Sequence, residues 1–252
     1  MTHQTMGEAT RDAVTVRGHD LTGDLIGRIG FTDMVLLELT GTLHDDAAKT
    51  VLDAVLVALT EHGLTPTAVV ARLTDLGAPG AMQSAVAAGL LGAGDRFLGA
   101  LDGCARLLQE WPDDVDDTEH AATLVARMRA DGRRVPGLGH PTHTDGDPRT
   151  PALYRVADAA GQATTARDRL EMVRAEVERT TGRSLPVNVD GAAAVLLTEL
   201  GLPWQVCRGV ALVARSAGLV GHLLDEQRRP TAAAIWASAE QTAPYQPPDV
   251  PK

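Results

Sequence analysis

The residues best suited to chemistry lie in one glycine- and proline-rich stretch, residues 135–149, which reads VPGLGHPTHTDGDPR. Gly137 and Gly139 lack a Cβ, so backbone N–H groups around them can approach an anionic ligand. His140 follows at once, and histidine is the side chain most easily recruited for acid–base chemistry near neutral pH. Arg149, on a segment stiffened by proline, can bind a carboxylate through paired hydrogen bonds. The stretch is a candidate catalytic loop, although such loops are often plain connections between helices.

Two later segments supply further candidate groups. Residues 186–191 read PVNVDG and place Asp190 at the expected start of a helix, where aspartate is commonly an N-cap. Residues 214–222 read ARSAGLVGH and contribute Arg215. A carboxyl group and an imidazole on opposite sides of a reacting bond can act together as acid and base.

Together the three segments resemble the catalytic signature of the citrate synthase family, which is PGxGH with DPR, then NVD, then ARxxG. The stretch GLLGAGDRFLGALD at residues 89–102 is similar to the matching segment of the citryl-CoA lyase module in ATP-citrate lyases. Citrate synthases have a histidine where this chain has Phe97. The resemblance runs in the same order from about Val14 to Pro230. It implies an all-α, compact citrate-synthase-like helical fold with a large and a small helical domain and at most a short N-terminal β element.

We expect residues 1–252 to form a single unit of this kind. The resemblance assigns about 14–130 and 185–240 to the larger helical part, and about 131–184 to a smaller part on the CoA side. Closely spaced prolines predict a flexible tail over 241–252.

The resemblance also implies roles for the residues of the first two motifs. His140 would lie at the oxaloacetate carbonyl or the citryl hydroxyl, and Asp190 at the acetyl methyl group. Backbone N–H groups of Gly137, Leu138 and Gly139 would bind CoA.

Four more residues would bind the oxaloacetate or citrate moiety: His62, Arg149, Arg215 and Arg229. His62 matches a histidine that hydrogen-bonds oxaloacetate, but a histidine at a helix C-terminus is also favoured by the helix dipole. Arg149 and Arg215 match carboxylate-binding arginines. Arg229 is similar to an arginine that crosses from the partner subunit, although exposed arginine pairs are usually just solvated. His222 is expected to be a packing residue.

The activity implied is that of a carbon–carbon lyase, which cleaves citryl-CoA to acetyl-CoA and oxaloacetate by a retro-Claisen reaction. CoA is then a co-substrate, and no permanent cofactor or metal is expected. Phe97 cannot donate a hydrogen bond, which disfavours citrate synthesis by the usual route. Two alternatives stay open. The first is a transferase reaction, the condensation of acetyl-CoA or another acyl-CoA with oxaloacetate or a related 2-oxo acid. The second is a noncatalytic CoA-ester-binding subunit. No Walker-type loop occurs, so a bound nucleotide is expected to be CoA and not a hydrolysed ATP, and a separate CoA ligase is a candidate partner.

Composition narrows the class of protein. A net charge of −10 argues against a nucleic-acid or anionic membrane surface. We find no apolar run of the ~18 residues that a membrane span needs and no signal peptide. The two cysteines, Cys104 and Cys207, are expected to be buried thiols, so a cytoplasmic protein is predicted. The acidic residues of 111–117 are consecutive, which favours a solvated connection over a metal site.

The pattern of apolar residues is helical almost throughout. Residues 1–13 are expected to be loose, 14–21 to form a short extended segment, and Thr22 to cap a helix. The helix over 81–93 consists mainly of small and aliphatic residues and should be covered on every side. Since the corresponding helices form the subunit interface in the family, we expect a homodimer or tetramer. The predicted helices are 31–39, 45–62, 65–76, 81–93, 95–111, 118–131, 151–159, 165–181, 189–200, 204–214 and 218–227.

Overall fold

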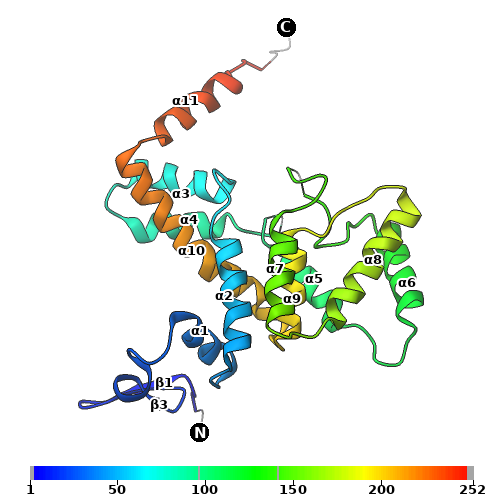
Figure 1. Ribbon diagram of the computed structural model, residues 1–252. Helices are drawn as coiled ribbons and strands as arrows, with labels where there is room; N and C mark the ends of the chain where they lie inside the picture. The colour runs from blue at the N-terminus through cyan, green and yellow to red at the C-terminus, as the bar shows by residue number, and fades with distance from the viewer. Residues whose placement is uncertain (1–2, 96, 141, 249–252) are drawn as a thin grey trace. The chain divides into compact units, whose positions relative to one another are not determined.

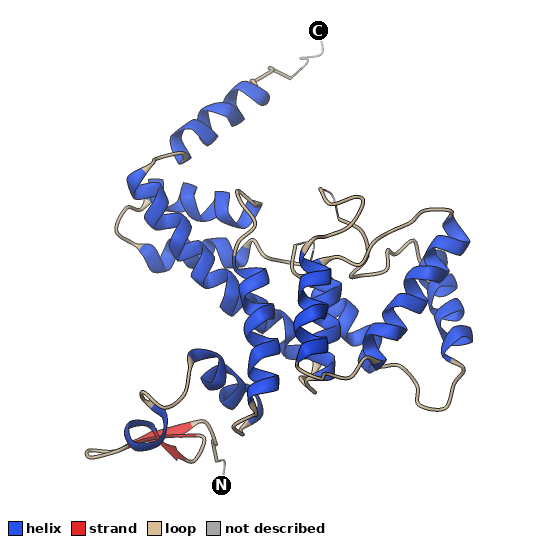
Figure 2. Ribbon diagram, in the orientation of Figure 1, coloured by secondary structure: helices blue, strands red, loops and turns tan. Residues whose placement is uncertain are grey.

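The computed structural model describes residues 3–95, 97–140 and 142–248, and their regular structure is mainly helical (Figures 1 and 2). The predicted all-α class is therefore confirmed. The exception is a three-stranded antiparallel sheet near the N-terminus, in the order β1 (Gly7–Ala9), β2 (Val14–Val16) and β3 (His19–Asp20). Thr15 pairs with Glu8 on one side and with Asp20 on the other. The strand β1 lies where we expected a loose segment, because a strand of three residues is too short to show an alternating pattern.

A π-helical turn, η1 (Leu21–Leu25), and eleven α-helices follow in the described part of the chain. Asp20, and not the predicted Thr22, caps η1, because the Asp20 carboxylate accepts from the N–H groups of Thr22 and Gly23. The helices are α1 (Phe31–Thr40), α2 (Asp46–Thr60), α3 (Pro66–Gly77), α4 (Met82–Leu91), α5 (Gly99–Gln109), α6 (Asp117–Ala130), α7 (Arg149–Ala159), α8 (Thr165–Thr181), α9 (Val189–Glu199), α10 (Trp204–Arg228) and α11 (Ala232–Thr242).

The helix pattern was predicted well except near the C-terminus. Two helices were expected over 204–214 and 218–227, but α10 is continuous. The helix α11 was not predicted, so the expected tail starts two residues too early, and residues 243–248 have no regular structure. Residues 249–252 of that tail lie outside the described part of the chain.

The backbone divides into two compact units, which are described separately. Unit 1 contains residues 1–58 and 98–210, and unit 2 contains residues 59–97 and 211–252. The predicted division into a larger part and a CoA-side part concerns ligand binding and stays a prediction.

In unit 1, α9 is the central helix. It packs against α5, α7 and α8, as Figure 1 shows, and α6 packs against α8. Every residue from Val189 to Leu197 is buried except Asp190. Both cysteines are free and buried, as predicted, and burial raises the pKa of each thiol.

In unit 2, α3 packs against α4 and α11. Its core consists of small and branched side chains: Ala68, Ala71, Ala85, Leu219 and Leu223. A Cβ added at Gly89 of α4 would lie 2.9 Å from the Thr67 carbonyl oxygen, so glycine lets the backbones of α4 and α3 approach closely here. The opposite side of α4 is exposed in this single chain, with Leu91 86% exposed.

Within the described residues, α10 is long and apolar enough, by length and composition, to cross a membrane. We predicted no membrane span from the sequence, because no uninterrupted run of apolar residues is long enough. The helix α10 contains interspersed polar residues, but its mean hydropathy is high enough for a span. Half of that apolar stretch is buried inside the protein, and a single helix of this kind is weak evidence for a membrane span, because buried core helices can have the same length and composition.

The continuity of α10 generates a testable prediction. A Cβ at Gly218 would overlap the carbonyl oxygen of Thr60, so Gly218→Ala should destabilise the protein by about 1–3 kcal/mol in chemical denaturation. The matched control is Gly221→Ala on the same helix, where a Cβ meets nothing within 4 Å. That control should be neutral or stabilising by about 0.5–1 kcal/mol, and equal effects of the two changes would contradict the packing described here.

Candidate active site

The predicted catalytic loop, residues 135–149, connects α6 to α7 and is hydrogen-bonded to the segment before α9. The Gly139 N–H donates to the Pro186 carbonyl at 2.7 Å, and the Asn188 N–H donates to the Gly137 carbonyl at 3.0 Å. Between these bonds, Leu138 and Val187 form an antiparallel β-bridge. Two motifs about fifty residues apart in sequence therefore lie side by side within unit 1.

Glycine is needed where the loop meets α9. Gly137 has φ +83°, and a Cβ there would lie 2.8 Å from the Cys104 sulfur and 2.9 Å from Gly191 Cα. A Cβ at Gly191 would overlap the Gly137 carbonyl oxygen. We had assigned the loop glycines to ligand binding alone. Gly137 is in addition a packing residue that lets the loop backbone touch the first turn of the helix.

His140 has a defined hydrogen-bonding state. Its Nδ1 accepts from the N–H groups of Thr142 at 3.1 Å and His143 at 3.0 Å. A neutral ring that accepts at Nδ1 carries its proton on Nε2, so Nε2 is the donor nitrogen of His140. The His143 ring lies against it, with ring centroids 4.5 Å apart. His143 is thus a partly buried neighbour of the predicted catalytic histidine.

Asp190 lies in the first turn of α9, where the helix dipole favours a negative charge. It is not the N-cap. That function belongs to Asn188, whose Oδ1 accepts from the Gly191 N–H at 3.0 Å. The Asn188 amide also donates to the Gly139 carbonyl at 2.6 Å, so this one side chain caps the helix and holds the loop. We missed Asn188, although the preference of asparagine for N-caps could have identified it.

Asp147 is the second residue that the sequence analysis missed. Its carboxylate is buried and accepts from Arg149 Nε at 3.0 Å and Nη2 at 2.8 Å, and from the Val189 N–H at 3.0 Å. Burial alone would raise the pKa of Asp147, but these hydrogen bonds and the Arg149 charge outweigh it and lower the pKa to about 2. Asp147 thus binds Arg149 through Nε and Nη2, and Nη1 takes no part in this pair of hydrogen bonds. Asp147 therefore links the guanidinium expected to bind substrate to the backbone beside Asp190.

The remaining predicted residues belong to unit 2. His62 lies half-buried in the turn between α2 and α3, Arg215 is buried on α10, and Arg229 is exposed just after α10. Their substrate-binding roles stay predictions, as does binding of CoA by Gly137, Leu138 and Gly139. Phe97 is 45% exposed, and its neighbour Arg96 in the predicted motif lies outside the described residues, as does Pro141 of the loop.

The family model for the citrate synthase C-terminal domain matches residues 22–236. A probable ATP-citrate synthase of Dictyostelium discoideum is 34% identical over 164 residues, which cover 58% of this chain and 26% of the relative. A probable ATP-citrate synthase subunit 1 of Neurospora crassa is 30% identical over 211 residues, 77% of this chain and 31% of the relative. The chain thus spans about a quarter to a third of the length of these two relatives.

Solved structures give the same likeness. The citryl-CoA lyase of Hydrogenobacter thermophilus is similar over 100% of this chain and 98% of its own, with a TM-score of 0.86 and 28% identity. Citrate synthase from Thermotoga maritima is similar over 88% of this chain and 58% of its own, with a TM-score of 0.67 and 17% identity. The second likeness supports the fold alone. The predicted citrate-synthase-like fold is confirmed.

Asp147 generates a prediction on the pH dependence of stability. Because its pKa falls from 3.8 to about 2 on folding, its contribution is present above pH ~4 and is lost as the pH falls through about 2. Asp147→Asn should destabilise the protein by about 2–3 kcal/mol at pH 7 and flatten the stability profile between pH 4 and 2. Thermal melts across this range measure both effects. The control is Asp145→Asn, a change at an exposed aspartate in the same loop, and matching profiles of the two variants would refute the role of Asp147.

Proposed function

The chain belongs to the citrate synthase family, and on that premise we propose that it cleaves citryl-CoA to acetyl-CoA and oxaloacetate. The observation that carries the proposal is the likeness to citryl-CoA lyase, which extends over nearly the whole of both chains. An ATP-citrate lyase solved with citryl-CoA has the same fold over 98% of this chain. The arrangement of the loop and the first turn of α9 supports it, because it brings the segments of His140 and Asp190 together in unit 1.

The chemistry requires two groups at opposite ends of the breaking bond. The tertiary hydroxyl of citryl-CoA must lose its proton as it becomes a ketone, and the departing acetyl-CoA enolate must gain a proton on carbon. We assign His140 to the hydroxyl end as a hydrogen-bond donor. Its Nε2–H fits the oxygen that becomes the ketone of oxaloacetate, and the proton that the hydroxyl loses passes to water, because Nδ1 of His140 already accepts from the backbone. Asp190 is assigned to the carbon end.

The surroundings of Asp190 suit an acid that works on carbon, since such a group must be partly desolvated. Val187, Val189 and Ala192 are all buried around the first turn of α9. Asn188 caps the helix, so the Asp190 carboxyl group is not needed for that purpose.

Charged groups would position the substrate. Two carboxylates remain on citryl-CoA once the third is a thioester, and we assign them to Arg149, Arg215 and Arg229, with His62 on the oxaloacetate moiety. Asp147 holds Arg149 in one orientation before a substrate arrives, which reduces the cost of ordering it. CoA would bind at the backbone of Gly137 to Gly139.

The remaining expectations complete the proposal. A separate CoA ligase would supply the thioester, and the buried, free cysteines fit a cytoplasmic enzyme. We also propose a homodimer or tetramer in which α4 contributes to the subunit interface, because Leu91 at the end of α4 is 86% exposed in this single chain. An exposed leucine next to a helix of small residues can be covered by a second copy of the chain.

The first test removes the proposed acid. Asp190→Ala should lower citryl-CoA turnover by about 10³-fold or more, while calorimetry shows that CoA still binds. The matched control is Asp168→Ala, which removes an aspartate from the first turn of α8 instead of α9. The control should retain activity, since Asp168 lies outside the proposed site.

Near-normal turnover in Asp190→Ala would refute the assignment. Release of free thiol from acetyl-CoA and oxaloacetate by the wild type would favour the condensing alternative. CoA binding with no turnover of either substrate pair would favour a noncatalytic subunit.

The second test concerns assembly. Leu91→Asp places a charge on the proposed interface and should convert the dimer to a monomer in sedimentation velocity. Leu64→Asp, a change at an exposed leucine outside α4, should leave the dimer intact. A monomeric wild type, or a dimer in both variants, would contradict an interface at α4.

A further inference from the structure

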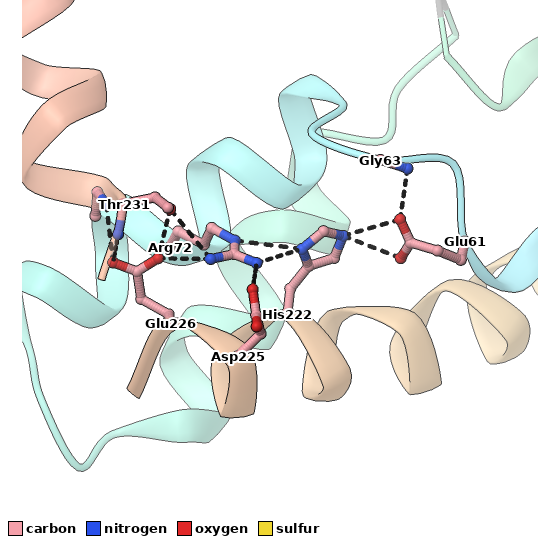
Figure 3. Close-up of polar contacts among 8 residues, drawn as sticks. Glu61, Gly63, Arg72, His222, Asp225, Glu226 and Thr231 are labelled. Carbon is pink, nitrogen blue, oxygen red and sulfur yellow. Dashed lines mark hydrogen bonds and ion pairs between the residues drawn. The ribbon is translucent and has the colours of Figure 1, made fainter. Parts of the chain in front are cut away.

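Unit 2 contains a hydrogen-bond network centred on a buried arginine that no predicted role accounts for (Figure 3). Arg72 of α3 is only 3% exposed. Its Nη1 donates to Glu226 at 2.6 Å and to the Thr231 hydroxyl at 3.1 Å, and its Nη2 donates to Asp225 at 2.8 Å. A buried guanidinium needs such partners, because an unpaired charge in the interior is very costly.

The Glu226 side of the network is a structural anchor. Glu226 also accepts from the N–H groups of Thr231 at 2.7 Å and Ala232 at 2.8 Å, at the start of α11. Burial would raise the pKa of Glu226, but these bonds and Arg72 lower it to about 2. The carboxylate is therefore ionised throughout the neutral range and fixes Arg72 in place.

His222 extends the network away from this anchor. Arg72 Nε and Nη2 both donate to His222 Nδ1, at 3.2 and 2.9 Å. Arginine offers only donors, so Nδ1 must be the unprotonated nitrogen and Nε2 must carry the ring proton. That Nε2 lies 3.2 and 3.0 Å from the two carboxylate oxygens of Glu61. Figure 3 shows the imidazole between the guanidinium and this carboxylate.

Glu61 in turn closes the turn that carries His62. Its Oε1 accepts from the N–H of Gly63, which has φ +74°. Glu61 and Gly63, which this hydrogen bond joins, are the two chain neighbours of His62. An exposed Glu–His pair alone would contribute little, but this imidazole is 10% exposed and is held from behind by Arg72.

We propose that His222 is a positioning residue for His62: it transmits the fixed orientation of Arg72 to the Glu61–Gly63 turn. The inference rests on the proposed function in one respect, because it takes His62 as a group that contacts the oxaloacetate moiety. His222 itself touches no substrate in this scheme. This positioning role replaces our expectation that His222 is a packing residue.

The test uses a substitution that separates the two contacts. In His222→Asn, the amide oxygen takes about the place of Nδ1 and still accepts from Arg72, but the side chain is too short to donate to Glu61. We expect KM for citryl-CoA to rise about tenfold, with a smaller change in kcat and little change in Tm, because one hydrogen bond to a charged group is lost. Glu61→Leu, which removes the acceptor at the other end of the same contact, away from the buried Arg72, should give a similar KM.

Controls separate positioning from general damage. His120→Asn, a change at a histidine whose ring lies tilted against Trp111 in unit 1, should leave KM unchanged. In a His62→Ala background, His222→Asn should add nothing further to KM, since the residue it positions is gone. Full additivity there, or an unchanged KM in both His222→Asn and Glu61→Leu, would overturn the proposal.

A readout without turnover keeps this inference separate from the proposed activity. In ¹⁵N NMR of histidine-labelled protein, His222 should be protonated at Nε2, and the His62 ring resonances should shift in both His222→Asn and Glu61→Leu. If the wild type fails to cleave citryl-CoA, the proposed function fails and these resonances still decide the positioning role. A His222 ring protonated at Nδ1, or His62 resonances unmoved in both variants, would overturn it.

Discussion

The close contact between the loop backbone at Gly137 and the first turn of α9 at Gly191 is the constraint on which the candidate site depends. With no Cβ on either residue, the loop carbonyl can approach the helix directly. Asn188 then hydrogen-bonds both partners, once as the helix cap and once to the Gly139 carbonyl. A side chain at either glycine would separate the segments that carry His140 and Asp190.

Buried carboxylates hold the cationic groups of the two units in place. In unit 1, Asp147 binds Arg149 through two nitrogens and also accepts from the Val189 N–H. In unit 2, Glu226 binds Arg72 and the first N–H groups of α11. Each carboxylate has its pKa lowered to about 2, so both pairs stay ionised over the range in which enzymes work. The cost of burying charge is offset by several hydrogen bonds to each group.

Much of the fold followed from local patterns. Helices such as α8 and α3 were predicted almost to the residue, because the apolar spacing of both helices and the proline at the start of α3 are local signals. The prediction of two helices in place of α10 was wrong because the role of Gly218 depends on a tertiary contact and not on local sequence. Gly218 looks like an interruption in sequence, yet in the folded chain it permits contact with the Thr60 carbonyl.

The sequence alone determined the family, the helical class and the identity of the candidate groups, because a motif is a property of residue order. It did not reveal what holds those groups. Asp147 and Asn188 act through partners about forty to fifty residues away, and His222 through partners about one hundred and fifty residues away. Such pairings depend on how helices pack and on which polar groups become buried together. Only the tertiary structure decides that, since a buried donor must find whichever acceptor the packing brings within reach.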